Sequence, residues 1–430
     1  MYKNLSKILL ISLGITSFTW IPLPGSVKPL SFFIAIFVII LGLKKLPKFT
    51  KVDLLVSLFI LYAILRQSYV LYEVWNIGGS VYFKSRSVEQ DVITSLISII
   101  VFYVHYLSLK VSLKVLGIHD FLRCAIYGVG LSCLFAIMQF ILSSIGLSSV
   151  GNSITKIVSD SAIEWNDRAR GLAYEPSWLA SQITVIMIPF LLYLKVRGSN
   201  IRNWNLWMVL SIVSLIITFS RGGILALIII IIFYFATILN KKSMVNVFAF
   251  ITIGAISYPF ASNILLSNAY FRSTYSGIAE GLGQMNVREA FLKSNAGPRY
   301  AAWESALDTT VDKPIFGTGL GLQYREFAKN PPRWSIVLPE VRYWLSNYYP
   351  DRANPKNMIL RVSSELGIPA LVLFIVCIYI SFKTSRYRQI AIFMLPAIFI
   401  DFMSIDSFAL ITLPLFLAIG GKYESISHND

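Results

Sequence analysis

The sequence predicts an all-α polytopic membrane protein with about twelve transmembrane helices and one large, partly helical hydrophilic loop. Hydrophobic residues make up 56% of the 430-residue chain. Charged residues make up 14%, against about 25% in soluble domains. Several apolar windows are long enough to cross a hydrocarbon core of about 30 Å. A soluble fold would have no way to cover that much apolar surface, so we expect the chain to be embedded in a membrane.

The predicted spans are the long apolar windows between charged or polar segments. The first window follows Lys3 and Lys7 and resembles a secretory signal. Because further spans follow and no small-residue cleavage site is present, we expect a retained first helix. The predicted spans are 8–23, 30–43, 52–66, 92–108, 121–145, 176–194, 204–219, 222–240, 245–262, 366–382, 389–407 and 409–421.

Basic residues predict which connecting segments face the cytoplasm. With a cytoplasmic N-terminus, every second connection is rich in Lys and Arg, as at Lys44 and Lys45 and again at Lys110 and Lys114. The positive-inside rule requires this alternation. It places both termini in the cytoplasm and divides the chain into three parts. These are nine helices in 1–263, a periplasmic loop over 264–358, and the last three helices with a short cytoplasmic tail in 359–430.

The distribution of charge argues against a nucleic-acid-binding protein, and the placement of cysteine and histidine argues against a disulfide framework or a metal cluster. The net charge of +16 falls largely in the predicted cytoplasmic connections, and no basic patch stands apart from the spans, so we expect no nucleic-acid partner. The three cysteines lie in apolar stretches and the three histidines are scattered. This pattern offers neither a disulfide framework nor a His/Cys metal cluster. We therefore expect no metal and no cofactor.

The hydrophilic loop carries its own helical signals. Pro298 suits the first turn of a helix, and apolar residues then recur at helical spacing until Lys313-Pro314. Gly317, Gly319 and Gly321 follow as a flexible turn. We also note Asp401 and Asp406 near the outer end of the eleventh span, where an acid normally has a partner or a function.

The predicted outer face gathers four polar clusters. The planar fork of arginine matches phosphate oxygens, and helix N-termini add positive potential, so together they predict a diphosphate site. Each arginine could instead anchor to headgroups or pair with a carboxylate, and Arg170 could pair with Glu175. The clusters are Arg168, Arg170, Tyr174, Glu175 and Ser177 before the sixth span; Arg221 between two spans; Arg299, Tyr300 and Trp303 in the loop helix; and Lys356, Asn357, Arg361 and Glu365 before the tenth span.

The order of these motifs resembles the O-antigen polymerases (Wzy type) and the related O-antigen ligases. Each motif is short, but their order and shared outer location make the combination specific, and with the span pattern the resemblance covers most of the chain. The matching pieces are Arg170-Gly-Leu-x-x-Glu-Pro-Ser177, Ser220-Arg-Gly-Gly223, Arg299-x-x-x-Trp303, Pro314-x-x-Gly317-x-Gly319 and Asn357-x-x-Leu360-x-x-x-x-Glu365-Leu-Gly-Ile368.

The resemblance implies a fold like that of multi-span lipid-linked glycosyltransferases in the bacterial inner membrane. It implies metal-independent transfer of a glycan from undecaprenyl diphosphate at the periplasmic face, with membrane lipids and a chain-length regulator protein as further partners. Carried over by motif, Arg221 and Arg299 become diphosphate clamps. Glu175 is the first candidate for the base that serves the acceptor hydroxyl, and Glu365 is the second.

Two alternatives to a repeat-unit polymerase stay open. Ligases, which add glycan to the lipid A core, commonly have His where this chain has Lys356, so the sequence favours a polymerase. A non-enzymatic lipid-oligosaccharide flippase or transporter would place its charges near the bilayer midplane and often has two similar halves. Here the charges gather at one face, which disfavours a carrier.

Overall fold

The structure, a computed structural model, describes residues 1–20, 28–76, 82–84, 86–159, 168–198, 201–238, 296–348 and 352–421. The predicted span 245–262 and loop residues 264–295 lie outside these ranges. The described part is helical apart from one antiparallel hairpin of two short strands. The helical fold class is therefore confirmed.

The first half of the chain alternates long and short helices. These elements are α1 (Tyr2–Ile11), η1 (Ser12–Gly14), α2 (Leu30–Gly42), η2 (Leu43–Lys45), α3 (Lys51–Asn76), β1 (Tyr82–Phe83), β2 (Arg86–Ser87), α4 (Val88–Ser144), α5 (Ser148–Val158), α6 (Pro176–Gln182), the π-helical turn η3 (Ile183–Met187), α7 (Ile188–Val196), α8 (Trp204–Ile217) and α9 (Arg221–Ile238).

The described part of the second half begins in the hydrophilic loop and ends in three apolar helices. Its elements are α13 (Gly297–Asp312), α14 (Gln323–Lys329), η4 (Arg333–Val337), α15 (Pro339–Leu345), α16 (Met358–Leu366), α17 (Ile368–Thr384), α18 (Arg388–Phe402) and α19 (Thr412–Gly420).

Three described helices are long and apolar enough to cross a membrane: α3, α4 and the continuous α6–η3–α7 segment over Pro176–Val196. Helices α8, α9 and α17 are apolar but shorter. The apolar helices fit a membrane protein, whereas twelve spans and a periplasmic loop remain predictions.

Two predicted spans take a different form. The first, 8–23, does not form a continuous helix, because α1 ends at Ile11 and is followed only by the short turn η1. Gly14 of that turn lies so close to the backbone of Gly128 that a Cβ would overlap its carbonyl oxygen. The fourth and fifth spans were expected to be separated by a loop, but they join in one element, α4, which turns at Gly117 (φ 71°, ψ 167°).

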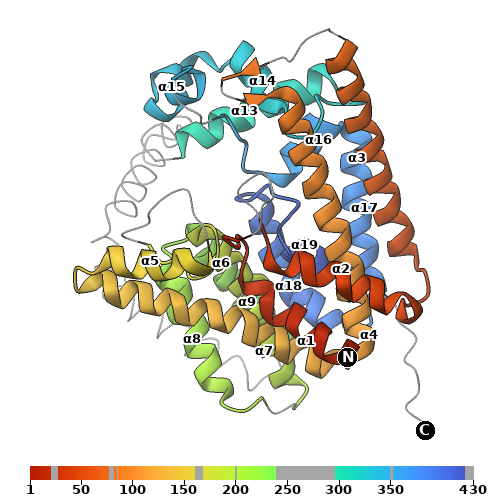
Figure 1. Cartoon of the computed structure of the whole chain (residues 1–430), viewed down its shortest axis with the longest axis vertical. Helices are drawn as coiled ribbons and strands as arrows, with labels where there is room; N and C mark the ends of the chain where they lie inside the picture. The colour runs from red at the N-terminus through yellow and green to blue at the C-terminus, as the bar shows by residue number, and fades with distance from the viewer. Residues whose placement is uncertain are drawn as a thin grey trace.

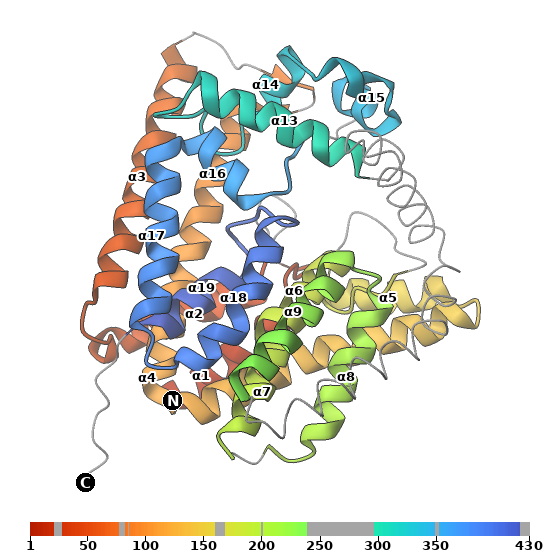
Figure 2. The same cartoon turned by 180° about the vertical axis from the view of Figure 1, so that it is seen from behind.

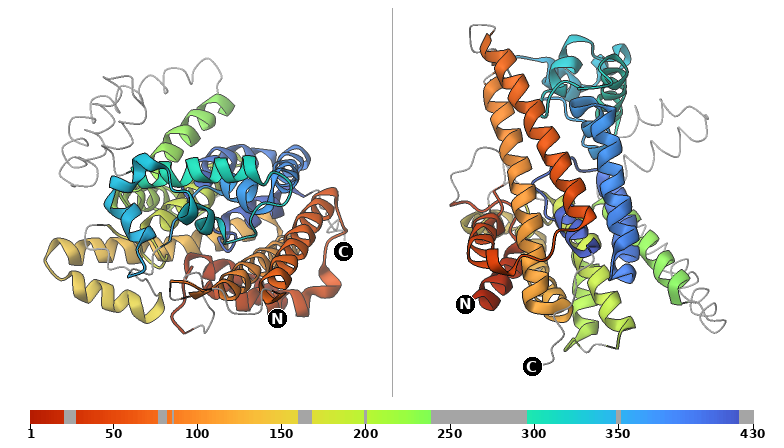
Figure 3. Two further views of the ribbon diagram at one scale, coloured as in Figure 1. Left: turned by 90° about the horizontal axis from the view of Figure 1, so that it is seen from above. Right: turned by 90° about the vertical axis from the view of Figure 1, so that its right-hand side faces the viewer.

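The helices form two groups (Figure 1). The upper group consists of the loop helices α13–α15, and the lower group consists of α1, α2, α5–α9, α18 and α19. Helix α3, the first half of α4 and α17 run side by side along the long axis, and the loop helices α13–α15 cap one end (Figures 1 and 2). The second half of α4 crosses the lower group together with α5 (Figures 1 and 3). The N-terminus lies at the end opposite α13–α15 (Figure 1).

Two hydrophobic cores hold the helices together. The larger core joins α3, α4, the Pro176–Val196 segment and α17–α19, with Phe121, Phe190 and Phe416 fully buried. The smaller core lies under the loop and packs Ala301, Phe327 and other loop residues against the C-terminal end of α3 and the N-terminal end of α4. The loop helices therefore pack on the ends of α3 and α4. This packing fixes the position of the polar residues that lie between the loop and those helix ends.

Candidate functional site

The start of α6 has the geometry that the sequence predicts. Pro176 occupies the first turn and Glu175 is the N-cap, in an extended conformation (φ −132°, ψ 155°). Ser177 Oγ donates to Glu175 Oε2 over 3.2 Å. The half-buried Glu175 carboxylate therefore lies at the mouth of the helix, where the helix dipole favours a negative charge.

Arg170 and Arg168 hold the turn that leads into α6. The guanidinium of Arg170 is buried and donates to the carbonyl oxygens of Ala173 (2.7 Å) and Ser159 (2.9 Å). Arg168 Nε donates to the carbonyl oxygen of Thr218 over 2.9 Å. These bonds give both arginines a part in local folding, and their role in substrate binding remains a prediction. The ring of Tyr174, in the same turn, lies 5.4 Å from that of Trp178.

Arg221 is the first residue of α9 and half-buried. Its helix begins close to α6, since a Cβ on Gly223 would lie 2.8 Å from the Cβ of Ala180. Because the Arg168 side chain binds Thr218, the residue directly after α8, the Arg168 turn and the start of α9 lie in one region. The structure thus gathers the first two predicted clusters at the N-terminal ends of α6 and α9.

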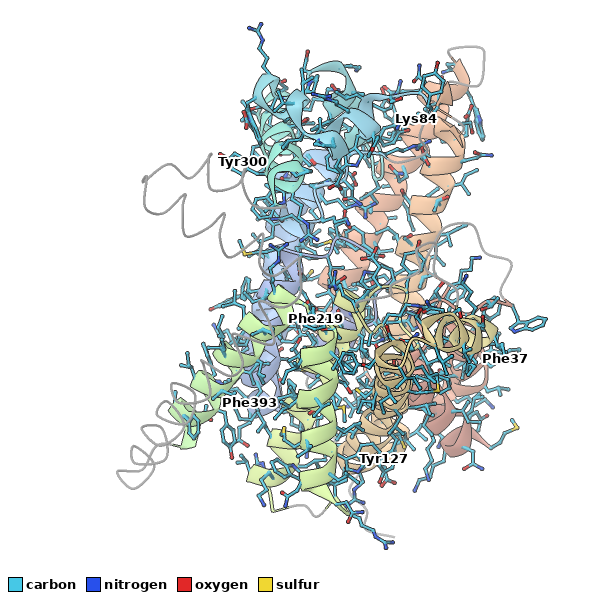
Figure 4. All side chains as sticks on the ribbon, turned by 90° about the vertical axis from the view of Figure 1, so that its left-hand side faces the viewer. Phe37, Lys84, Tyr127, Phe219, Tyr300 and Phe393 are labelled. Atoms are coloured by element: carbon cyan, nitrogen blue, oxygen red, sulfur yellow. The ribbon has the colours of Figure 1, made fainter. Side chains whose placement is uncertain are left out.

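Arg299 lies in the other group of helices. It is half-buried in the first turn of α13, beside Tyr300, whose ring centroid lies 5.6 Å from that of Trp334. Trp303 Nε1 donates to the carbonyl oxygen of Pro355 over 2.6 Å and ties α13 to the segment before α16. In Figure 4, Tyr300 is in the loop layer and Phe219, two residues before Arg221, is in the lower group. The joint clamp by Arg221 and Arg299 remains a prediction.

The last cluster begins at α16. Asn357 is its N-cap, and the side-chain Oδ1 accepts from the Leu360 amide over 3.1 Å. Lys356 directly before it has a left-handed backbone (φ 44°), and its amide donates to Asn354 Oδ1 over 2.9 Å. This turn directs the chain from the loop layer into α16, which carries Arg361 and Glu365.

Glu365 is fixed on one side only. Its Oε2 accepts from Arg361 Nε (2.9 Å) and from the Gly321 amide (2.8 Å). Its Oε1 makes no hydrogen bond to any residue that the structure describes. Arg361 NH1 also donates to the Asp406 carbonyl oxygen over 2.5 Å and lies 3.9 Å from its carboxylate. One arginine is therefore shared by two acids from different parts of the chain.

The surroundings of Glu365 shift its acidity. Burial raises the pKa of this carboxyl above its ordinary value, and the positive charge of Arg361 and the Gly321 amide offset part of that rise. A carboxylate with a raised pKa is a stronger base than an exposed one.

A cavity of about 220 Å³ opens beside Glu365. It lies between the N-terminal end of α4, the turn before α14 and the segments before α16 and α19. The close approach of this turn to α4 depends on Gly321 (φ 79°), where a Cβ would overlap Ser95 Oγ. The cavity is lined by Asp91, Thr94, Ser95, Gly321, Gln323, Tyr324, Arg352, Ala353, Asn354, Pro355, Arg361, Glu365 and Asp406.

The residues of one wall of this cavity were not predicted from the sequence. Asp91 in α4 pairs with Arg352 and accepts from the Tyr324 hydroxyl over 2.8 Å, while the Arg352 guanidinium lies 4.5 Å from the centre of the Tyr324 ring. Asp91 directly precedes the predicted span 92–108, and nothing local in the sequence indicates that a loop arginine reaches it. The available signal was that Arg352 lies shortly before the motif that begins at Asn357.

Helix α18 and the segment after it connect the two groups of polar residues. Asp401 accepts from Ser181 Oγ in α6, and a Cβ on Gly222 at the start of α9 would contact Ser404. Asp406 follows in the same segment and binds Arg361. Both acids that the sequence singled out near the outer end of α18 therefore have partners, one in each group.

The apolar helices and the polar residues between their ends define a helical membrane protein with a buried acid–arginine site. Residues 206–375 match the family model described as O-antigen ligase. This match confirms the resemblance to the O-antigen ligase and polymerase family. It runs from α8 into α17 and includes Arg221, Arg299 and Glu365, whereas Glu175 and Asp91 precede it. No curated protein matches the chain.

Proposed function

We propose that the chain polymerises lipid-linked glycan repeat units at the periplasmic face of the bacterial inner membrane. The observation that carries the proposal is the environment of Glu365. This residue lies in the matched segment, at the wall of a cavity, with one carboxylate oxygen fixed and the other without a hydrogen bond among the described residues. A fixed acid beside a cavity suits a base that positions an acceptor hydroxyl.

The reaction forms one glycosidic bond. The acceptor hydroxyl oxygen attacks the anomeric carbon of the donor sugar, the bond from that carbon to the diphosphate breaks, and undecaprenyl diphosphate leaves with the bonding electrons. The proton of the hydroxyl passes to the carboxylate. Because the diphosphate leaves as an anion, the transition state needs positive groups near it, and Arg221 and Arg299 are the proposed donors.

The surroundings of the two candidate acids support Glu365 as the base. Glu175 caps a helix and accepts from Ser177 next to it. Glu365 faces a cavity, is 5% exposed at its side chain, and has a raised pKa. This reverses the order expected from the sequence, and Glu175 becomes the second candidate, on the side of the diphosphate.

A ligase is the second candidate function, since the matching family model carries that description. The residue before Asn357 supports the polymerase instead, because Lys356 supplies no imidazole there. Deleting the gene and separating the surface glycan on a gel distinguishes the possibilities. Single capped repeats support the polymerase, loss of surface glycan with accumulated lipid-linked chains supports the ligase, and loss of both supports a flippase.

A further inference from the structure

We propose that the cavity beside Glu365 is the subsite for one uncharged sugar ring of the acceptor. The inference rests on the proposed glycan transfer and adds the class of group that this site holds. At about 220 Å³, the cavity is smaller than the pockets of about 300–1,000 Å³ that hold drug-sized ligands. It therefore suits a single ring rather than a longer stretch of glycan.

The lining chemistry suits hydroxyl groups. Carboxylates accept hydrogen bonds, guanidinium groups donate them, and hydroxyls do both. Sugar hydroxyls can satisfy all three kinds of partner. The cavity wall provides carboxylates from Asp91, Glu365 and Asp406, guanidinium groups from Arg352 and Arg361, and hydroxyls from Thr94, Ser95 and Tyr324.

Gln323 supplies an independent sign of a ligand. Its side chain is 1% exposed and lines the cavity. Its Oε1 has no hydrogen-bond partner among the described residues, while Nε2 donates to Ser305 Oγ over 3.3 Å. A buried acceptor without a partner is costly. A hydroxyl donor bound in the cavity would relieve that cost.

The balance of charge selects among sugars. Three acids and two arginines line the cavity, and each arginine already pairs with an acid of the wall. A sugar carboxylate would therefore meet an excess of negative charge in a partly desolvated space, which opposes its binding. The cavity should accept a neutral ring and reject a uronic acid.

The position of Glu365 assigns the ring to the acceptor. A base must lie within hydrogen-bond reach of the proton that it removes, and that proton belongs to the acceptor hydroxyl. The proposed diphosphate arginine of the lower group, Arg221, lies at the start of α9, which approaches the segment after α18 at Ser404, and Arg361 beside the cavity binds Asp406 of the same segment. Because Glu365 lines the cavity, the ring held there is the one whose hydroxyl can meet the base.

The test uses an acceptor that cannot act as a donor. The probe is the repeat-unit oligosaccharide released from its lipid by mild acid, which lacks the diphosphate. Saturation-transfer NMR with the purified full chain in nanodiscs measures its binding without any turnover. Thr94→Phe fills the cavity from α4 and should weaken probe binding by about tenfold or more. Ile93→Phe adds the same ring next to it on an exposed face, because Ile93 is 45% exposed and does not line the cavity.

The outcomes separate this inference from the proposed function. Weaker binding in Thr94→Phe, with wild-type binding in Ile93→Phe and unchanged melting temperatures, supports the subsite. Equal binding in all three proteins overturns it, as does a Thr94→Phe variant that loses affinity only for the intact lipid-linked donor. Oxidising the primary hydroxyls of the probe to carboxylates should abolish binding, and undiminished binding would overturn the neutral-ring assignment. If the wild type binds the probe but never lengthens chains, the proposed polymerase fails while the subsite stands.

Discussion

Arg361 donates from Nε to Oε2 of Glu365 one turn later on α16, over 2.9 Å. The same guanidinium reaches Asp406, which follows α18. This arginine therefore joins α16 to the irregular segment after α18 and forms part of the cavity wall. It also leaves Glu365 Oε1 for a substrate.

Removing the guanidinium should destabilise the fold. Arg361→Met leaves Glu365 buried without its counter-charge, and losing one partner of a buried pair typically costs about 3–5 kcal/mol. Thermal unfolding of the purified protein in detergent should show a clearly lowered midpoint. Arg333→Met, at an exposed position of η4, is the control and should stay within about 0.5 kcal/mol of the wild type. Equal midpoints for the two variants would show that the pair contributes no stability.

The pH profile of transfer should report the raised pKa of Glu365. The base works only when it is deprotonated, so kcat/KM should rise with pH through an acidic limb. Because burial raises this pKa, the midpoint of the limb should lie above the ordinary glutamate value of about 4.3. In Glu365→Gln the residual rate should lose this limb. A limb that persists in Glu365→Gln and disappears in Glu175→Gln would return the base role to Glu175.

Replacing the proposed clamp arginines with lysine should impair transfer even though the charge stays. Lysine lacks the planar fork that matches phosphate oxygens, and loss of one preorganised donor typically costs about 10²–10³ in rate. Arg221→Lys and Arg299→Lys should each lengthen chains slowly, with Arg333→Lys as the control. Wild-type chain lengths in both clamp variants would rule out the clamp.

The arginine clamp also predicts independence from metal. If arginines stabilise the departing diphosphate, the purified protein should keep its rate in excess EDTA. Carboxylates together with substrate phosphates can bind Mg²⁺, so a rate that falls in EDTA and returns with Mg²⁺ or Mn²⁺ would contradict this mechanism.

Topology can be tested at Tyr348, which is 95% exposed in the loop layer. A cysteine there should react in intact spheroplasts with a reagent that cannot cross membranes. Ser335, although in the same loop, is fully buried and unsuitable. Phe49→Cys, at a 68% exposed position expected in the cytoplasm, should react only after lysis. The reverse pattern would overturn the predicted orientation. The native cysteines are buried and give little background.

The sequence predicted best where a local signal decides the structure. Pro176 and Pro298 begin their helices as expected, because a proline loses no hydrogen bond in the first turn. The loop expected around Lys110 is helical instead. Lys110 is buried in an ion pair with Asp53, which also accepts from Tyr106 over 2.7 Å. Hydropathy treats a lysine as exposed, and a partner 57 residues away leaves no local trace.

The candidate site was also predictable only in part, where its residues are close in the sequence. Glu365, Arg361 and Asn357 lie close together in the sequence, which therefore already placed them in one candidate cluster. Asp91 and Arg352 are 261 residues apart, and only the packing of the loop on the end of α4 brings them together. The reading of Arg170 and Glu175 as a possible pair missed the bonds that hold Arg170 to the carbonyl oxygens of Ala173 and Ser159.

The central claim is transfer between lipid-linked repeat units with Glu365 as the base. The most direct test gives purified protein in nanodiscs nothing but undecaprenyl-diphosphate-linked repeat units and separates the products by length. The account predicts a ladder of lengthened chains with release of undecaprenyl diphosphate, and a rate about 10²–10⁴ lower for Glu365→Gln with its melting temperature preserved. A wild-type protein that makes no ladder but transfers glycan once lipid A core is added, or a Glu365→Gln variant that lengthens chains normally, would contradict it.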